Sequence, residues 1–193
     1  MGSANELIIT EELIKKIKAN DQKVLLEFYE FSFSNLMQSV VRYKSNRSDQ
    51  ILLVNNAFMK IISNIHKFQI GSNYKAWSKK IIQNEIIDDF RKNQRHARLD
   101  FTESIEKDVD STVSVNFDLE IEETRVLVLL NQLPPATRLV FNLLALEDMK
   151  PREICSELKL SPETVKWHLS EARKKLKLAL EKEQYYYHER ERK

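Results

Sequence analysis

The sequence predicts an all-α protein with two small helical domains, a flexible acidic linker between them, and a helix-turn-helix in the C-terminal domain. Three observations predict this fold. The 193 residues include only two glycines and four prolines, which disfavours β-hairpin turns. Apolar residues recur at helical spacing through two long blocks. Between the blocks lies a stretch that is acidic and has few periodic apolar residues.

These patterns set the predicted boundaries. We expect domains at residues 10–95 and 118–183, a linker at 96–117 and a polar tail at 184–193. Residues 93–123 hold three Lys and Arg against nine Asp and Glu, whereas residues 67–98 hold eight Lys and Arg against three acids. The small net charge of +2 therefore hides one strongly acidic and one strongly basic segment.

The first block predicts four helices. The first starts at Thr10, and a second begins after Asn20 and Asp21. Residues 45–49 are polar and predict a loop. The helix that follows, at residues 50–65, has a predicted buried face of Ile51, Val54, Phe58, Ile61, Ile62 and Ile65. A connector around Gly71 then leads to a helix from Tyr74 to about residue 95.

The second block predicts a helix that ends before two consecutive prolines, because proline cannot continue a helix. Pro135 can open the next helix, and the short helix PREICSEL follows. Lys159 and Leu160 make a turn, and Ser161 caps the last helix, in which Pro162 takes the first position. The inward face of that helix is Val165, Leu169, Ala172 and Leu176. We expect the tail at 184–193 to be frayed or partly disordered.

Two short helices with a tight turn, the second carrying polar and basic groups outward, are typical of a DNA-binding helix-turn-helix. The outward residues are Thr164, Lys166, Trp167, Ser170, Arg173 and Lys174. For this motif alone, an ordinary helical hairpin with a solvated basic face is the alternative. Trp167 favours the DNA-binding interpretation, since a bulky aromatic can pack on a base methyl or a sugar.

Other classes of protein are disfavoured. The single cysteine, Cys155, cannot form an internal disulfide and fits a reducing compartment. No run approaches the roughly 20 apolar residues of a membrane span, and the N-terminus lacks a signal-peptide pattern. Paired carboxylates in a pocket, metal-spaced His and Cys, and a phosphate-binding glycine loop are not found. We therefore expect a cytoplasmic protein with no catalytic residues, no metal, no cofactor and no small-molecule substrate, and one that is not membrane-embedded.

Several segments together resemble a known family. LNQLPPATRLVFNL and EICSELKLSPETVKWHLSEARKKL resemble the promoter-recognition domain of bacterial RNA polymerase sigma factors. LIKKIKANDQKVLLEFYEFSFSNL, AFMKII and YKAWSKKIIQNEIIDDFRKNQR resemble the other conserved sigma domain. Two such domains with an acidic linker are similar to the extracytoplasmic-function (ECF) class. The resemblance covers residues 13–93 and 117–181.

The resemblance implies three sets of site residues. The helix containing AFMKII would dock on the clamp of the large polymerase subunit through Asp49, Asn55, Asn56 and Lys60. Family members usually carry several carboxylates there, so this chain departs from the pattern. Promoter opening and minus-ten recognition would use Phe68, Gln69, Ser72, Asn73, Tyr74, Lys75, Lys80, Asn84 and Arg91. These residues would hold a flipped, unpaired base and its backbone. Minus-thirty-five recognition would use Thr164, Lys166, Trp167, Ser170, Glu171, Arg173 and Lys174.

The same resemblance implies partners: core RNA polymerase through the clamp and flap of its large subunits, promoter DNA, and an anti-sigma factor. The acidic linker would thread toward the active-site channel or simply keep the chain soluble. A stand-alone helix-turn-helix regulator is the alternative function, although the first block lacks the strands of a receiver domain. An enzyme acting on nucleic acid is a further alternative, disfavoured by the missing catalytic groups.

Overall fold

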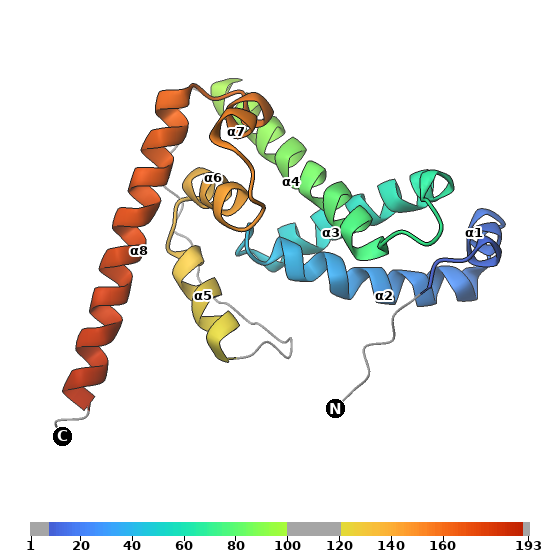
Figure 1. Ribbon diagram of the computed structural model, residues 1–193, viewed down its shortest axis with the longest axis horizontal. Coiled ribbons are helices and arrows are strands. Elements are labelled where there is room, and N and C mark those ends of the chain that lie inside the picture. Colours follow the sequence, from blue (N-terminus) through green and yellow to red (C-terminus); the bar gives the residue numbers. More distant parts are fainter. Residues whose placement is uncertain (1–7, 100–120, 191–193) are drawn as a thin grey trace. The chain divides into compact units, whose positions relative to one another are not determined.

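The structure is a computed structural model that describes residues 8–99 and 121–190, with side chains at 8–94 and 124–182 (Figure 1). It divides the chain into two compact units, residues 1–41 with 47–88, and residues 42–46 with 89–193. All regular secondary structure in the described ranges is helical, which confirms the predicted fold class. Within the same ranges, no helix is both long enough and apolar enough to cross a membrane. Most of the predicted linker, residues 100–117, lies outside the described residues.

The described residues of the first unit form three complete helices, one short 3-10 turn and the first part of a fourth helix. They are α1 (Glu11–Lys18), α2 (Gln22–Val40), α3 (Arg47–Asn64), η1 (Ile65–Lys67) and α4 (Tyr74–Leu99). The hydroxyl of Thr10 accepts from the Leu13 amide at 3.1 Å, and the Asp21 carboxylate accepts from Lys23 and Val24 at 3.1 and 3.2 Å. These side chains satisfy amides that a helix start leaves unpaired, so both predicted helix starts are confirmed.

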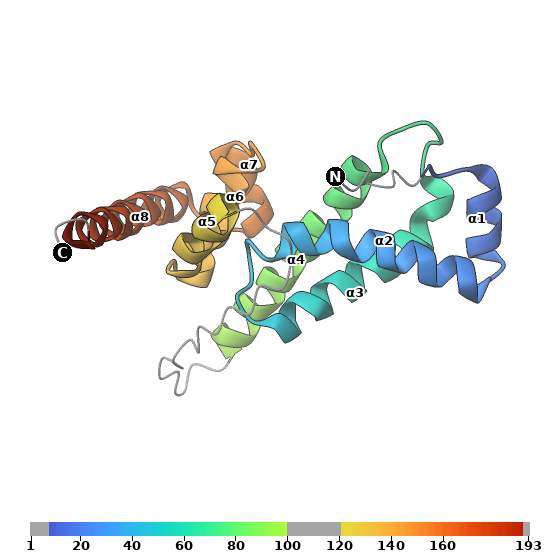
Figure 2. The same cartoon turned by 90° about the horizontal axis from the view of Figure 1, so that it is seen from below.

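The core of the first unit lies between helices that pack side by side. Figure 2 shows α2 and α3 lying alongside one another, and α1 packs on α2. The buried side chains include Phe28, Leu36, Val54, Ile61 and Ile82. Their spacing on each helix follows the 3.6-residue period, which gives each helix one face toward the core.

The structure corrects two details of the prediction for α3. The helix begins at Arg47, inside the segment predicted to be a loop. Ile51, which was predicted to be on the buried face, is 36% exposed. The buried face runs instead through Leu53, Ala57 and Ile61, which recur at intervals of four. A helix with apolar residues on more than one side does not reveal from its own sequence which side is covered.

The second unit contains the helix-turn-helix. Its helices are α5 (Ile121–Asn131), α6 (Pro135–Ala145), α7 (Pro151–Leu158) and α8 (Pro162–Arg190). Helix α6 packs against α8, and Leu130, Leu133 and Ala172 form a buried cluster with Phe141 and Leu176 against it. Pro135 opens α6 as predicted. The prediction ended the last helix too early, because α8 continues to Arg190 through most of the expected tail.

Arg138 holds the connection between α5 and α6. Its guanidinium, only 3% exposed, donates to Asn131 Oδ1 at 2.8 Å, to the Asn131 carbonyl at 2.9 Å and to the Leu133 carbonyl at 3.1 Å. The two carbonyls lie at and just after the end of α5, where backbone acceptors have no partner within the helix. The guanidinium supplies the missing donors. Burial lowers the pKa of Arg138 to about 10, so the group is still charged at neutral pH.

We expect Arg138→Met to lower the free energy of unfolding of the second unit by about 2–3 kcal/mol, because it leaves buried acceptors without a donor. Urea unfolding measures this, followed by the fluorescence of Trp167 in a Trp77→Phe background, so that only the second unit reports. Arg152→Met is the matched control, since Arg152 is an exposed arginine on α7. Equal losses in the two variants would contradict this role for Arg138.

Candidate nucleic-acid interface

A short connector between η1 and α4 is anchored at both ends. Phe68 and Tyr74 are 6% and 5% exposed, whereas residues 69–73 between them are exposed. The Tyr74 hydroxyl lies 2.7 Å from the Ser32 hydroxyl, which is also buried. The Phe68 ring packs edge-on against Tyr74 and Trp77, with centroids at 6.1 and 5.3 Å. The two buried ends, Phe68 and Tyr74, therefore hold the connector in place while residues 69–73 face solvent.

The middle of the connector, residues 69–73, has a defined conformation of its own. Gly71 has a φ of 84°, in the left-handed region that suits glycine. The Ser72 amide and hydroxyl both donate to the Gln69 carbonyl, at 3.0 and 2.6 Å. Asn73 caps α4, because its Oδ1 accepts from the Ala76 amide at 3.0 Å. The exposed polar groups are thus held by local hydrogen bonds before any ligand arrives.

A cavity of about 210 Å³ opens beside this connector. Its lining combines apolar side chains with polar groups of the connector: Ile8, Ile9, Phe31, Gly71, Ser72, Asn73, Tyr74 and Lys75. Ile8 and Ile9 come from the segment before α1. No sequence pattern predicted this contact, because it joins residues about sixty positions apart that share no motif.

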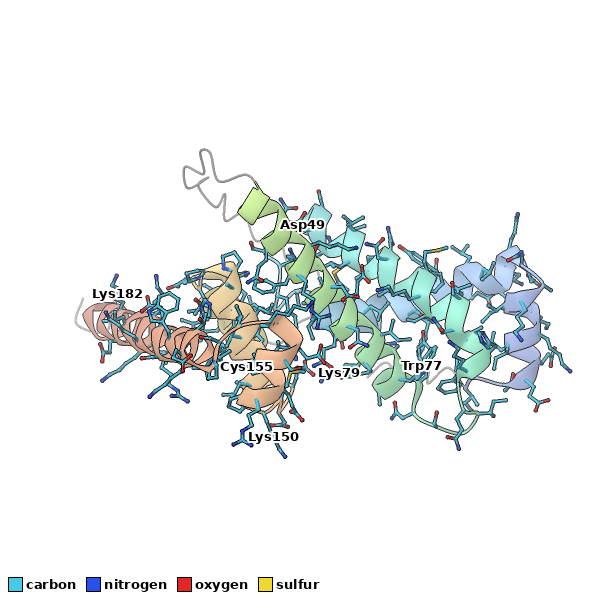
Figure 3. All side chains as sticks on the ribbon, turned by 90° about the horizontal axis from the view of Figure 1, so that it is seen from above. Asp49, Trp77, Lys79, Lys150, Cys155 and Lys182 are labelled. Atoms are coloured by element: carbon cyan, nitrogen blue, oxygen red, sulfur yellow. The ribbon has the colours of Figure 1, made fainter. Side chains whose placement is uncertain are left out.

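The structure narrows the set of residues predicted to contact unpaired DNA. Burial removes Phe68 and Tyr74 from that set, since neither ring can stack on a base without leaving the core. The exposed members on the connector and on α4 are Gln69, Ser72, Asn73, Lys75, Lys80 and Asn84. Lys80 and Asn84 are four residues apart and share one face of α4. Figure 3 shows Trp77 and Lys79 on the same helix.

Arg91 differs from the other members of the predicted set. It lies in the part of α4 that belongs to the second unit. Its Nη2 is 2.8 Å from Glu157 Oε2, and its Nε donates to the Glu157 carbonyl at 2.5 Å. A phosphate that bound through Nε or Nη2 of Arg91 would have to compete with these contacts.

The exposed face of α3 holds the residues predicted to contact polymerase. Asp49, at its start in Figure 3, and Asn56 are exposed. Asn55 is exposed too, and its Oδ1 accepts from the Tyr29 hydroxyl at 2.8 Å. Lys60 contacts the buried Glu85 carboxylate and lies 3.4 Å from Asp88. A hydrogen bond with Glu85 raises the pKa of Lys60.

The prediction missed the apolar part of this face. Leu52 and Met59 are 58% and 63% exposed and flank Asn56 at helical spacing. The sequence of α3 alone could not show this, because only packing identifies Leu53, Ala57 and Ile61 as the covered side. Large contiguous apolar patches mark interaction sites, and these two side chains add apolar area to the face predicted to contact polymerase.

The helix-turn-helix is built by local rules. Lys159 adopts the left-handed conformation, with φ 54° and ψ 43°, and ends α7. The Ser161 hydroxyl accepts from the Thr164 amide at 3.2 Å, which confirms the predicted cap of α8. Val165 and Ala172 are 1% and 0% exposed, and Leu169 is 9% exposed. The predicted inward face is therefore confirmed at these positions.

The first turns of α8 expose a mixed polar, basic and aromatic surface. Its exposed members are Lys166, Trp167, Ser170, Arg173 and Lys174, whereas Thr164 and Glu171 are half-buried. The Trp167 ring is 58% exposed and packs edge-on against His168, with centroids 4.9 Å apart. Glu171 lies 3.7 Å from Lys175, so its carboxylate already has a cation beside it. This surface can offer donors to base edges and positive charge to phosphates.

Comparison with known proteins assigns the two parts of the chain. The family model described as "Sigma-70 region 2" matches residues 33–96, and that described as "Sigma-70, region 4" matches residues 123–176. The chain is 29% identical over 136 residues to the "ECF RNA polymerase sigma factor EcfG" of Rhodopseudomonas palustris (strain TIE-1), which covers 70% of this chain and 72% of that protein. It is 27% identical over 157 residues to the "RNA polymerase sigma factor SigV" of Bacillus subtilis (strain 168), with coverage of 81% and 86%.

Two solved structures are also similar. One is the sigma factor RpoE of Bartonella quintana in complex with the anti-sigma factor NepR, with a TM-score of 0.46 and 23% identity. That match covers 85% of this chain and 98% of RpoE. The other is CnrH in complex with the cytosolic domain of CnrY, with a TM-score of 0.43, 21% identity, and coverage of 93% and 98%.

We expect the second unit to lose stability as the pH falls below about 6.5, and His168→Gln to reduce that loss. The half-buried His168 has its Nδ1 3.0 Å from Thr137 Oγ1, and burial lowers the pKa of its ring from 6.5. The unfolded chain then takes up the proton at a higher pH than the folded chain. The contribution of His168 to the free energy of unfolding is complete above the pKa of the ring in the unfolded chain. It is lost as the pH falls toward the lower pKa of the ring in the folded chain.

Urea midpoints at pH 8 and pH 5.5, for the wild type and the variant, measure this dependence. The wild type should lose more stability between the two pH values than His168→Gln, whose uncharged amide does not titrate. Parallel losses in both proteins would show that His168 makes no contribution.

Proposed function

The chain belongs to the sigma-70 family of RNA polymerase sigma factors, with regions 2 and 4 both present, and from this premise we propose that it grips a promoter at two separate points. A sigma factor is a non-enzymatic subunit that directs core RNA polymerase to promoters and starts transcription there. The match to region 2 favours this function over a stand-alone helix-turn-helix regulator, which would need only the second unit.

The observation that carries the proposal is the anchored connector of the first unit. Opening a promoter requires the protein to trap unpaired bases rather than to break a bond. The connector offers exposed polar groups beside a cavity, and α4 continues with basic residues that can follow a DNA backbone. We assign capture of the minus-ten element to Gln69, Ser72, Asn73, Lys75, Lys80 and Asn84.

In the second unit we assign the minus-thirty-five element to α8. Its N-terminal turns would enter the major groove, where Lys166, Trp167 and Ser170 meet base edges. Arg173 and Lys174 would contact phosphates, which fix the register without reading sequence. Glu171 can accept from a cytosine amino group, although its contact with Lys175 competes with that role.

The partners follow from the same assignment. We propose that the exposed face of α3 binds the clamp of core polymerase, that the second unit meets the flap, and that an anti-sigma factor controls the chain. The work takes place in the bacterial cytoplasm, where core polymerase and promoters are found. The acidic linker would run close to the polymerase channel, whose walls bind nucleic acid and therefore suit a chain of negative charge.

Replacing Lys166 and Trp167 with Ala should lower transcription from a promoter that depends on its minus-thirty-five element by at least tenfold. Each lost base contact costs about 1–3 kcal/mol. The measurement is run-off transcription with core polymerase. Lys182→Ala is the charge-matched control, since Lys182 is exposed near the far end of α8 (Figure 3).

The double variant should bind core polymerase like the wild type, as judged by co-purification. Its promoter affinity should also depend less steeply on salt concentration, because the double variant lacks the positive charge of Lys166 near the DNA. Loss of core binding in a folded double variant would contradict the assignment of these residues to DNA.

On α3, Asn56→Asp should strengthen association with core polymerase, and Asn56→Ala should weaken it. We expect this because other family members usually carry several carboxylates just before the residue equivalent to Phe58, and Asn56→Asp adds one carboxylate to that stretch. Titration of labelled protein with core polymerase gives the affinities, and an effect of about threefold to tenfold is expected for a rim polar contact. Ser63→Ala, also exposed on α3, serves as the control. If neither Asn56 variant changes the affinity for core polymerase, the proposal that this face of α3 binds core polymerase is wrong.

A further inference from the structure

Thr137 and His168 join α6 to α8 inside the second unit. The Thr137 hydroxyl oxygen lies 3.0 Å from Nδ1 of His168, and Thr137 is only 1% exposed. Thr137 stands in the first turn of α6, two residues after Pro135, and α6 packs against α8. A buried hydroxyl needs a hydrogen-bond partner, and the imidazole supplies one here. The hydrogen bond therefore holds the His168 ring against α6 in one orientation.

The His168 ring in turn contacts the indole of Trp167. The two ring centroids are 4.9 Å apart and the ring planes are inclined by 69°, which is an edge-on contact. Adjacent residues on a helix point about 100° apart, so their side chains do not normally face each other. The contact therefore requires the two rings to lean toward one another. Among the residues whose side chains are described, His168 provides the only ring that touches Trp167.

We propose that Thr137 and His168 are positioning residues for Trp167, and that Thr137 influences promoter selectivity although it is too buried to touch DNA. The inference rests on the proposed function, which assigns Trp167 to a base of the minus-thirty-five element. Trp167 is 58% exposed, so part of the indole is free for DNA while its contact with His168 limits its motion. A side chain that is already ordered loses less conformational freedom when it binds.

The expected effect is on selectivity, because base contacts and phosphate contacts respond differently. Arg173 and Lys174, which we assign to phosphates, contribute at any DNA sequence. Trp167 contributes only where its base is present. If the indole were loose, it would have to be ordered at the moment of binding, which lowers the affinity for the correct element. Affinity for other sequences would change little.

The chemistry at position 137 can be changed without changing its shape. Burial lowers the pKa of His168, so its ring is neutral at neutral pH, with one nitrogen that donates and one that accepts. The Thr137 hydroxyl can take either role toward Nδ1. Valine has the shape of threonine and can take neither role, whereas serine keeps the hydroxyl.

The first test uses the holoenzyme formed from the full chain and core polymerase. It is bound to a promoter that it transcribes, and to the same promoter with the minus-thirty-five element replaced by unrelated sequence. Thr137→Val should lower the ratio of the two affinities about threefold, and Thr137→Ser should retain most of it. The control is Leu139→Val, which trims a buried side chain on another side of α6 and should leave the ratio unchanged.

A double-mutant cycle separates positioning from a general loss of packing. Trp167→Ala alone should lower the ratio. Adding Thr137→Val to Trp167→Ala should lower it no further, since no indole is left to position. His168→Gln removes the ring that contacts Trp167 and should act like Thr137→Val in both backgrounds. It is the second variant should Thr137→Val fail to fold.

The free chain gives an independent readout. Time-resolved fluorescence anisotropy of Trp167, in a Trp77→Phe background, measures the local motion of the indole. Thr137→Val and His168→Gln should make that motion faster, whereas Thr137→Ser and Leu139→Val should not.

The outcomes separate this inference from the proposed function. An unchanged ratio in Trp167→Ala would overturn the proposed assignment of Trp167 to the minus-thirty-five element. A ratio that falls in Trp167→Ala, but responds to neither Thr137→Val nor His168→Gln, would overturn the inference alone. So would a further loss when either change is added to Trp167→Ala, or indole motion that is the same in both variants as in the wild type.

Discussion

One buried hydrogen bond, between Ser32 Oγ and Tyr74 Oη, determines where the connector of the first unit lies. It is 2.7 Å long and joins α2 to the first residue of α4, with both residues at most 5% exposed. Burial raises the pKa of the Tyr74 phenol, so the group stays neutral. If Ser32 were absent, the buried hydroxyl would lose its partner at a cost of about 1–3 kcal/mol. The start of α4, its cap at Asn73 and the cavity beside it all depend on this attachment.

The rings around Tyr74 explain why the aromatic residues of the connector serve the fold rather than a base. Tyr74 packs against Phe28, Phe31 and Trp77, with centroids 5.5, 5.8 and 6.0 Å apart. Such pairs add to the apolar burial that each ring already provides. Drawing Tyr74 out to stack on a base would lose all of these contacts together. If the connector captures a base as proposed, the exposed polar residues between its two buried ends are the ones that can contact it.

The sequence predicted features that depend on residues close together in the chain, and it did not predict those that depend on residues far apart in it. The caps at Thr10, Asp21 and Ser161 and the inward face of α8 depend on residues within one or two turns, so the local pattern was sufficient. Tyr74 could not be assigned in this way, since its burial depends on Ser32.

The same limit applies to the candidate site. Lys60 reads as a free surface lysine until α4 brings Glu85 and Asp88 to it. Ile8 reads as part of an N-terminal segment without a motif, until the fold carries it to the connector. The types of residue at the site were predictable, but which of them face a ligand depends on packing between distant segments.

If the proposed assignment of α8 and the connector to DNA holds, the acidic residues 93–123 favour selectivity over affinity. On that assignment, binding of α8 to one promoter element would keep the connector of the first unit near the other element, so the second binding step would be intramolecular. The intervening residues 93–123 carry nine acids against three bases, so DNA phosphates repel them. A basic stretch would instead bind phosphates at any sequence, which strengthens binding to every competing site as much as to the promoter. Because the acidic stretch adds no such contact, the difference in affinity between a promoter and other DNA would depend on the two proposed base-reading sites, the connector and α8.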